Sequence, residues 1–306
     1  MTIHHLQIFV AVAECGSMSE AARKHHLSQP TVSQLIRELE EHYGTKLFER
    51  LSRKLYITES GKKLLSCAKG LLCGYEEMEY TMSQQKRRER IRTGSSVTVG
   101  SCLMPDIVRR FSKKCPEVDI FNQVSNTERV EELLLASELD IAVVEGKVKS
   151  EELITEQLMD DYVVLFCAGG HRFAARSEVE IDELCRENFV LREKGSGTRE
   201  IFERFMKERQ KPVHTRWEVV SFASTLRAVC EDNCIGAASV RLLAEALDSG
   251  QVKAIYEPGG SWDRSFSLVR HRHKFLTEGL SAFIQVAEES SPTVLPERSC
   301  MAKLCW

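Results

Sequence analysis

The stretch SMSEAARKHHLSQPTVSQLIRELEEHYGTKLFERLSR, residues 17–53, contains two helical patterns separated by a short turn. In the second helix, expected at 29–43, the apolar residues share one face, as in a helix packed against a core; they are Val32, Leu35, Ile36 and Leu39. The opposite face is polar and cationic, and most of its side chains can hydrogen-bond to base edges and phosphates. This face consists of Gln29, Pro30, Thr31, Ser33, Gln34 and Arg37. The pattern predicts a helix-turn-helix that contacts duplex DNA, with an ordinary all-helical domain as the alternative.

The flanking residues supply the rest of a small DNA-binding domain. Ser17 and Glu20 have the spacing of a capping box, and Ser28 can cap the second helix. After Gly44, an apolar pair is followed by basic residues and an alternating stretch, which predicts a two-stranded wing. The basic residues of this wing expected to contact phosphates are Arg50 and Arg53.

These residues resemble a known family. Residues 9–50, FVAVAECGSMSEAARKHHLSQPTVSQLIRELEEHYGTKLFER, are similar to the N-terminal domain of LysR-type transcriptional regulators. The segments SQPTVSxxIxxLE and GxxLFER carry the resemblance, which continues more weakly to about residue 290. It implies a winged helix-turn-helix, a dimer, and an effector-binding domain like a periplasmic binding protein.

Composition is consistent with a two-domain protein that binds DNA. A length of 306 residues suggests about two domains, and no apolar run approaches the roughly 18 residues that a bilayer requires. The start MTIHHLQIF lacks the pattern of a signal peptide, and the eleven cysteines have no metal-type pairing, so we expect reduced thiols in a cytoplasmic protein. Residues 1–93 carry a net charge of +4, and the remainder carries −7. A basic module joined to an acidic domain fits a DNA-binding protein with a ligand domain.

A second helical pattern follows the wing, between residues 59 and 92. Its apolar residues step alternately by four and three, which is the spacing of a coiled-coil seam; they are Leu64, Ala68, Leu71, Tyr75, Met78 and Met82. We expect this seam to pair two copies of the chain in a homodimer, which could assemble further into a homotetramer. Packing of the stripe against the chain's own core is the alternative. The basic run at 86–92 and the small residues at 93–96 are typical of a helix end and a hinge.

Beyond the hinge, strands and helices alternate, which predicts parallel sheet with right-handed crossovers. We expect the first strand at 96–100 and the helix after it at 105–114, and the later alternation suggests two α/β lobes. The fold class is therefore α+β overall: a winged helix-turn-helix, a linker helix, and a two-lobed α/β domain of periplasmic-binding-protein type. The expected boundaries are 1–58, 59–92, 93–290 and a tail of unassigned role at 291–306. Lobe 1 takes about 93–162 and 268–290, and lobe 2 takes about 163–267.

Ligands of such a domain occupy the cleft between the lobes. The sequence REKGSGTRE, residues 192–200, places Gly195, Ser196, Gly197 and Thr198 between a strand and a helix. Free N–H groups and the helix dipole there would suit an anion, although a simple helix-capping turn is the alternative. The family resemblance implies that this loop lines the effector site together with Asn126 and Thr127, and Ser221 is a further candidate of the same type.

One departure from the family concerns the first lobe. Compared with the family pattern, we expect about five residues of a hydroxyl-rich loop to be absent after Gly100, which leaves Ser101 and Cys102 as the polar candidates there. The cleft could therefore be degenerate. Cysteine pairs such as Cys230 and Cys234 leave a redox-responsive regulator as another alternative.

The sequence favours one of three functional classes. An enzyme is disfavoured, because the sequence has no P-loop, nucleophile elbow, paired catalytic carboxylates or metal-spaced cluster. A plain solute-binding protein is disfavoured by residues 1–93. We therefore expect a DNA-binding regulator without a cofactor or metal. Its expected partners are double-stranded DNA, a small and anionic effector, and further copies of itself, with RNA polymerase as an additional candidate and no membrane.

Overall fold

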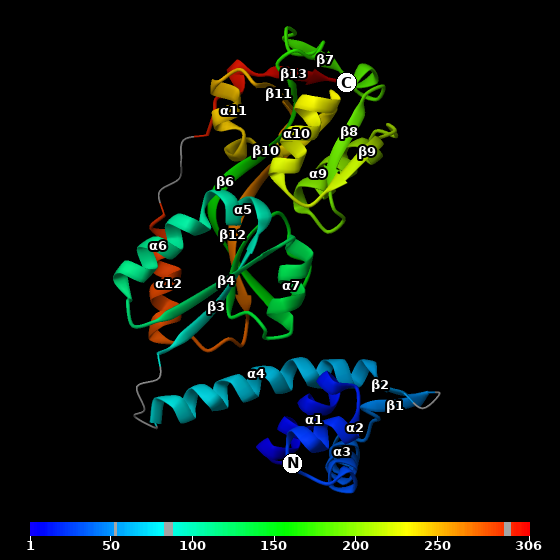
Figure 1. The fold of residues 1–306 in the computed structure, drawn as a ribbon, viewed down its shortest axis with the longest axis vertical. Helices are drawn as coiled ribbons and strands as arrows, with labels where there is room; N and C mark the ends of the chain where they lie inside the picture. The colour runs from blue at the N-terminus through cyan, green and yellow to red at the C-terminus, as the bar shows by residue number, and fades with distance from the viewer. Residues whose placement is uncertain (52–53, 83–87, 291–294) are drawn as a thin grey trace. The chain divides into compact units, whose positions relative to one another are not determined.

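The computed structural model describes residues 1–51, 54–82, 88–290 and 295–306. The chain divides into two compact units (Figure 1). The first comprises residues 1–87 with two short segments, 135–138 and 273–275, and the second comprises the remainder. No helix among the described residues has both the length and the apolarity needed to cross a bilayer.

The first unit is a winged helix-turn-helix followed by a long helix. Its elements are α1 (Ile3–Cys15), α2 (Met18–Lys24), α3 (Gln29–Tyr43), β1 (Phe48–Leu51), β2 (Lys54–Ile57) and α4 (Glu59–Met82). The side chains of Ser17 and Ser28 cap α2 and α3 as predicted, and Gly44 ends α3 at φ +63°. Strands β1 and β2 pair antiparallel, which confirms the two-stranded wing.

Glu40, in the last turns of α3, fixes the chain that leads into the wing. Its Oε1 accepts from the backbone N–H groups of Leu47 and Phe48, at 3.0 and 3.3 Å. Its Oε2 accepts from Lys46 Nζ at 2.6 Å. Burial opposes ionisation of Glu40, but these hydrogen bonds outweigh it and hold the pKa of the carboxyl below its usual value.

The second unit contains two α/β lobes. Lobe 1 is built from β3 (Arg90–Ser96), α5 (Val97–Cys102), α6 (Met104–Lys114), β4 (Asp119–Ser125), α7 (Thr127–Leu135), β5 (Ile141–Glu145) and α12 (Glu278–Glu288). Strands β4, β3 and β5 are parallel and adjacent, as the alternation predicted. Helices α6 and α12 cover one face of this sheet and α7 covers the other (Figure 1).

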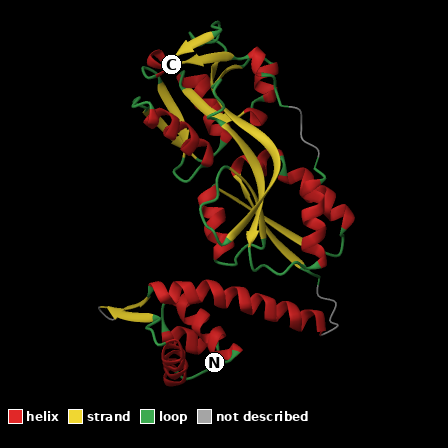
Figure 2. Ribbon diagram, turned by 180° about the vertical axis from the view of Figure 1, so that it is seen from behind, coloured by secondary structure: helices red, strands yellow, loops and turns green. Residues whose placement is uncertain are grey.

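Two long strands connect the lobes. β6 (Leu153–Ala168) and β12 (Asp263–His271) pair antiparallel and run from lobe 1 into lobe 2 (Figure 2). Their register shifts between Phe266 and Ser267, so that Leu158 forms a β-bulge.

Lobe 2 continues the same sheet. Its elements are β7 (Glu178–Glu180), α8 (Ile181–Leu184), β8 (Asn188–Arg192), α9 (Gly197–Glu208), β9 (His214–Val219), α10 (Phe222–Asp232), β10 (Ile235–Ser239), η1 (Val240–Leu242), α11 (Ala244–Asp248), β11 (Val252–Tyr256), η2 (Arg298–Cys300) and β13 (Ala302–Cys305). The C-terminal tail, whose role the sequence left open, supplies β13. This strand pairs with β11 and β7, and Leu304 is fully buried there.

The first strand of lobe 1 is the main correction to the sequence prediction. We expected it at 96–100, but β3 spans Arg90–Ser96 and residues 97–102 form α5. Residues 93–96, expected as a hinge, are buried in this strand. Thr93 and Ser95 hydrogen-bond to Asn122 of the neighbouring strand, and a Cβ at Gly94 would lie 2.5 Å from Leu139 Cδ1. The small residues at 93–96 had indicated a loop, but in the structure their small size allows close packing inside the sheet.

Candidate functional site

The polar face of α3 lies open at the surface of the first unit. Pro30, Thr31, Gln34 and Arg37 are exposed, whereas Gln29 and Ser33 are half-buried. Gln34 Nε2 donates to Glu38 Oε1 at 3.0 Å, and Thr31 hydrogen-bonds to the Ser28 hydroxyl at 2.7 Å. The opposite face packs into the core, where Val32, Ile36 and Leu39 are buried and Leu35 is partly buried. Arg37 has no hydrogen bond or ion pair within the described part of the chain.

The wing carries the other predicted DNA contacts. Arg50 lies in β1, where its backbone is paired opposite Leu55. Arg53 lies outside the described residues. A wing beside an exposed α3 is the usual arrangement for contacting DNA backbone and bases together.

The predicted seam of α4 divides into two parts. Leu64 and Ala68 pack into the core of their own unit, which agrees with the alternative that the stripe packs against the chain's own core. Further along, the side chains of Leu71 and Met78 are 49% and 51% exposed, and Tyr75 is half-buried. The side chain of Met82 lies outside the described set. The apolar side chains that a second copy of the chain could contact therefore lie in the distal half of α4, from Leu71 onwards.

The loop at 195–198 lies between the two lobes, at the start of α9. Gly195 adopts φ +83°, and its Cβ position is blocked by Glu128 of lobe 1 at 2.6 Å. A Cβ at Gly197 would lie 3.2 Å from the carbonyl oxygen of Glu145. The Ser196 hydroxyl is buried and has no hydrogen-bond partner among the described residues. The lobes thus meet on this loop, and glycine permits the approach.

Glu145 lies at the carboxyl end of β5 and is buried in the cleft. Its Oε1 accepts from Thr98 Oγ1 at 3.0 Å, whereas its Oε2 has no partner among the described residues. Thr127 Oγ1 donates to the carbonyl oxygen of Glu145 at 3.1 Å. Burial raises the pKa of the Glu145 carboxyl, and the nearby Arg264 partly opposes this shift.

Arg264, on the crossing strand β12, hydrogen-bonds to two side chains in the cleft. Its Nε donates to Asp161 Oδ2 at 2.7 Å and its Nη1 donates to Thr198 Oγ1 at 3.0 Å. Its Nη2 is buried without a partner among the described residues. Asp161 also accepts from Ser239 Oγ at 2.7 Å. A buried guanidinium with one free N–H edge is a ready donor for an anionic group.

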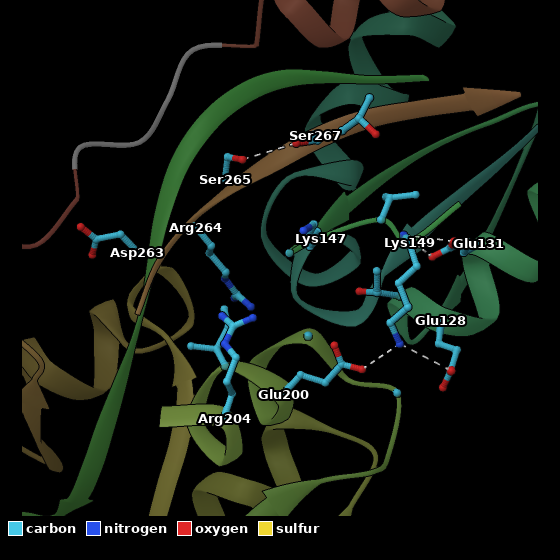
Figure 3. A pocket seen from close by; sticks show the side chains of 17 residues that line it. Glu128, Glu131, Lys147, Lys149, Glu200, Arg204, Asp263, Arg264, Ser265 and Ser267 are labelled. Atoms are coloured by element: carbon cyan, nitrogen blue, oxygen red, sulfur yellow. Dashed lines mark hydrogen bonds and ion pairs between the residues drawn. The ribbon is translucent and has the colours of Figure 1, made fainter. Parts of the chain in front are cut away.

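A pocket of about 480 Å³ opens beside this cluster (Figure 3). Its volume lies in the range typical of small-molecule sites. It is lined by both lobes and by the crossing strand β12; the charged lining residues are Glu128, Glu131, Lys147, Lys149, Glu200, Arg204, Asp263 and Arg264. A second, much smaller cavity is lined by Thr98, Arg192, Thr198, Phe222, Thr225, Ala237, Ala238, Ser239 and Leu242.

The effector residues predicted from the sequence fall into two groups. Thr127, Gly195 and Gly197 line the larger pocket, and Thr198 lines the smaller cavity. Ser196, which lies between Gly195 and Gly197 in the sequence, is buried. Asn126 Nδ2 donates to the Lys194 carbonyl at 3.3 Å, and this hydrogen bond joins lobe 1 to lobe 2.

Three other candidates lie outside both linings. Ser221 caps α10 through the N–H of Ser224. Ser101 and Cys102 lie at the end of α5 instead of at its start, and the Ser101 hydroxyl is bonded to the Val97 carbonyl. Because β3 ends at Ser96 and not near Gly100, the hydroxyl residues at the carboxyl end of this strand are Ser96 and Thr98, so the strand position from which the shortening of lobe 1 was inferred is corrected.

Sequence reasoning missed Thr98, Glu145, Arg204 and Arg264. Glu145 carried a usable signal, because it ends a buried parallel strand and ligands gather at such strand ends. Arg264 carried no such signal, because the sequence does not show that its strand crosses from one lobe to the other beside the cleft.

The cysteines are free thiols. Burial raises the pKa of Cys234 to about 11 and also raises that of Cys230, which disfavours the reactive thiolate.

A winged helix-turn-helix joined to a two-lobed α/β domain defines a class of DNA-binding regulators that carry a ligand-binding domain. Residues 3–62 match the family model described as "Bacterial regulatory helix-turn-helix protein, lysR family". Residues 84–292 match the model described as "LysR substrate binding domain". The chain therefore belongs to the LysR family of transcriptional regulators.

Known proteins are similar to this chain over most of its length. The transcriptional regulator YeiE of Escherichia coli K12, itself described as uncharacterized, is 28% identical over 291 residues, which cover 95% of this chain and 98% of YeiE. ArgP from Mycobacterium tuberculosis has the same fold, with a TM-score of 0.72, 16% identity, and coverage of 94% of this chain and 96% of ArgP. The CcmR regulatory domain of Synechocystis, solved in complex with 2-PG, gives a TM-score of 0.61 at 22% identity and covers 65% of this chain and 96% of that domain.

Proposed function

We propose that this regulator binds its operator through α3 and the wing, and that a small anionic effector in the interlobe cleft rearranges a homodimer or homotetramer on an interrupted inverted repeat. The regulator would act in the cytoplasm, in contact with chromosomal DNA. RNA polymerase is a further candidate partner.

The observation that carries the effector proposal is the buried Nη2 of Arg264, which has no partner among the described residues. The Ser196 hydroxyl at the start of α9 is also buried and has no hydrogen-bond partner among the described residues. Buried donors of this kind normally have acceptors, because an unmet donor loses the hydrogen bonds it made to water. An anion at the start of a twelve-residue helix would supply an acceptor and would also interact favourably with the helix dipole.

Contacts between the lobes give the effector a means of action. Asn126 and Thr127 of lobe 1 lie against the 194–198 segment of lobe 2, and Arg264 reaches Thr198. A ligand that binds more tightly to one arrangement of the lobes shifts the population towards it. The 2-PG named for CcmR supports an anionic ligand in a domain of this fold.

For DNA, the exposed Arg37 and the half-buried Ser33 on α3 are the proposed base contacts. The apolar distal half of α4 is the proposed dimer contact. The test is selection of bound fragments from the source genome with the full-length protein, followed by affinity measurements on the selected site. Arg37→Ala should weaken specific binding by about 1–3 kcal/mol. Lys63→Ala, an exposed change on α4, serves as the control. Parent-like affinity of both Arg37→Ala and Ser33→Ala would refute the assignment of the face.

The effector proposal is tested separately on the selected DNA. Metabolites of the genes adjacent to that site are added to the protein–DNA complex, and the footprint is compared with and without each compound. A compound that changes the footprint of the parent protein, but not that of Thr198→Val, supports the cleft as its site. A compound that changes both footprints equally counts against the cleft.

A further inference from the structure

The larger pocket brings together two arginines from different elements. Arg264 comes from the crossing strand β12 and Arg204 from α9, and their guanidinium groups point towards each other across the pocket wall (Figure 3). Lys147, in the segment after β5 of lobe 1, lines the same pocket. Cations therefore approach the pocket from lobe 1, from lobe 2 and from the strand that joins them.

The carboxylates of this pocket are already engaged. Glu128 and Glu200 both pair with Lys149 Nζ, at 3.8 and 3.2 Å. Glu131 accepts from the backbone N–H groups of Lys149 and Ser150. Asp263 pairs with Arg298 of the C-terminal segment. None of these four acids is paired with the two facing arginines or with Lys147.

The cations are engaged less completely. In the described part of the chain, Arg204 and Lys147 have neither a hydrogen bond nor an ion pair, and Arg264 retains the buried Nη2. Two guanidinium groups that face each other repel unless an anion lies between them. Each presents a planar edge of N–H donors that fits two oxygens of a carboxylate, sulfate or phosphate group.

We propose that Arg204 and Arg264, with Lys147, form an oxyanion subsite in this pocket, so that the effector is a small molecule with a phosphate, sulfate or carboxylate head group. The proposal rests on the anionic effector of the proposed function and names the groups that hold its charge. Because Lys147 belongs to lobe 1 and Arg204 to lobe 2, a bound oxyanion draws the two lobes together. The rest of the ligand would lie against Thr127 and Ser265, which line the same pocket.

The test uses the full-length protein and simple oxyanions as probes. Binding of inorganic phosphate, sulfate and acetate is measured by thermal shift and by calorimetry, with chloride at matched ionic strength as the reference. Parallel titrations with the three anions distinguish a phosphate or sulfate head group from a carboxylate. Arg204→Gln and Lys147→Gln each remove an exposed cation with no structural partner, so the fold should survive. Lys207→Gln, an exposed change on the same helix outside the pocket lining, is the matched control.

We expect at least one oxyanion to bind the parent and Lys207→Gln equally, and its affinity to fall by about tenfold or more in Arg204→Gln and Lys147→Gln. No binding of any of the three anions to the parent, or equal binding to Arg204→Gln, would overturn the subsite. Oxyanion binding that depends on Arg204 but leaves the operator footprint unchanged would support the subsite and contradict effector control of DNA binding.

Discussion

Arg264 on β12 donates a hydrogen bond to the hydroxyl of Thr198 at 3.0 Å, and so connects a strand shared by both lobes to the first turn of α9. The same guanidinium holds the buried Asp161. One side chain thus links the larger pocket, the start of the helix beside it and the interior of the crossing strands.

Arg264→Met should destabilise the second unit by about 2 kcal/mol, because it removes the closer of the two arginines that pair with the buried Asp161 carboxylate and leaves only Arg241. Urea unfolding followed by tryptophan fluorescence measures this unit alone, since the three tryptophans, Trp217, Trp262 and Trp306, all lie in it. Arg272→Met, an exposed change just beyond β12, should leave stability unchanged. A parent-like unfolding midpoint for Arg264→Met would show that the ion pair contributes nothing.

Leu304→Ala should destabilise the same unit by about 3 kcal/mol, because Leu304 is fully buried in the core of lobe 2. Its neighbour Lys303 points to the exposed side of β13, so Lys303→Ala is the matched control. The same fluorescence experiment compares the two variants. Equal stability of both would mean that the C-terminal strand is peripheral to the fold.

Met78→Lys should weaken self-association by at least about tenfold, because it places like charges where two copies of α4 would bury an apolar side chain. Sedimentation velocity at micromolar concentration measures the change. Glu79→Lys introduces the same side chain at the adjacent exposed position and should leave the parent assembly intact. A monomeric parent protein, or an unchanged Met78→Lys assembly, would contradict the proposed interface.

Glu145 should make the second unit less stable as pH rises. Burial raises its pKa above the ordinary 4.5, so the folded state binds a proton that the unfolded state releases. Its contribution to stability is therefore largest below about pH 4.5 and is lost as pH rises through the folded-state pKa. Glu145→Gln should flatten this part of the stability profile in urea unfolding.

The exposed Glu151→Gln serves as the control for Glu145→Gln and should leave the profile unchanged. A profile with the parent's slope in Glu145→Gln would show that another group titrates in this range.

The sequence was most informative where structure is local. The boundaries of α3 were predicted because Ser28 caps it, Gly44 ends it, and its apolar positions repeat at helical spacing. The two-lobed α/β architecture was predicted from the alternation of strand and helix patterns. By contrast, β3 was misplaced because Gly94 and its small neighbours have the composition of a loop, and only packing against Leu139 reveals their role.

The cleft was predicted in part for a related reason. Gly195 to Thr198 are consecutive residues, so their loop can be recognised in the sequence. Thr127 was found because it lies at the start of a helix. Arg264 and Arg204 are 60 positions apart in the chain and meet only because β12 returns beside α9. Glu145 resembles any other acid at a strand end until the second lobe covers it.

The ladder between β6 and β12 limits how a ligand can alter this domain. Their pairing runs without interruption from both lobes up to the bulge at Leu158. Translating one lobe along the other would break the whole series of backbone hydrogen bonds, whereas a bend at the bulge changes only a few dihedral angles. We therefore expect any movement of one lobe against the other to be a rotation about the bulge near Phe266 and not a sliding displacement.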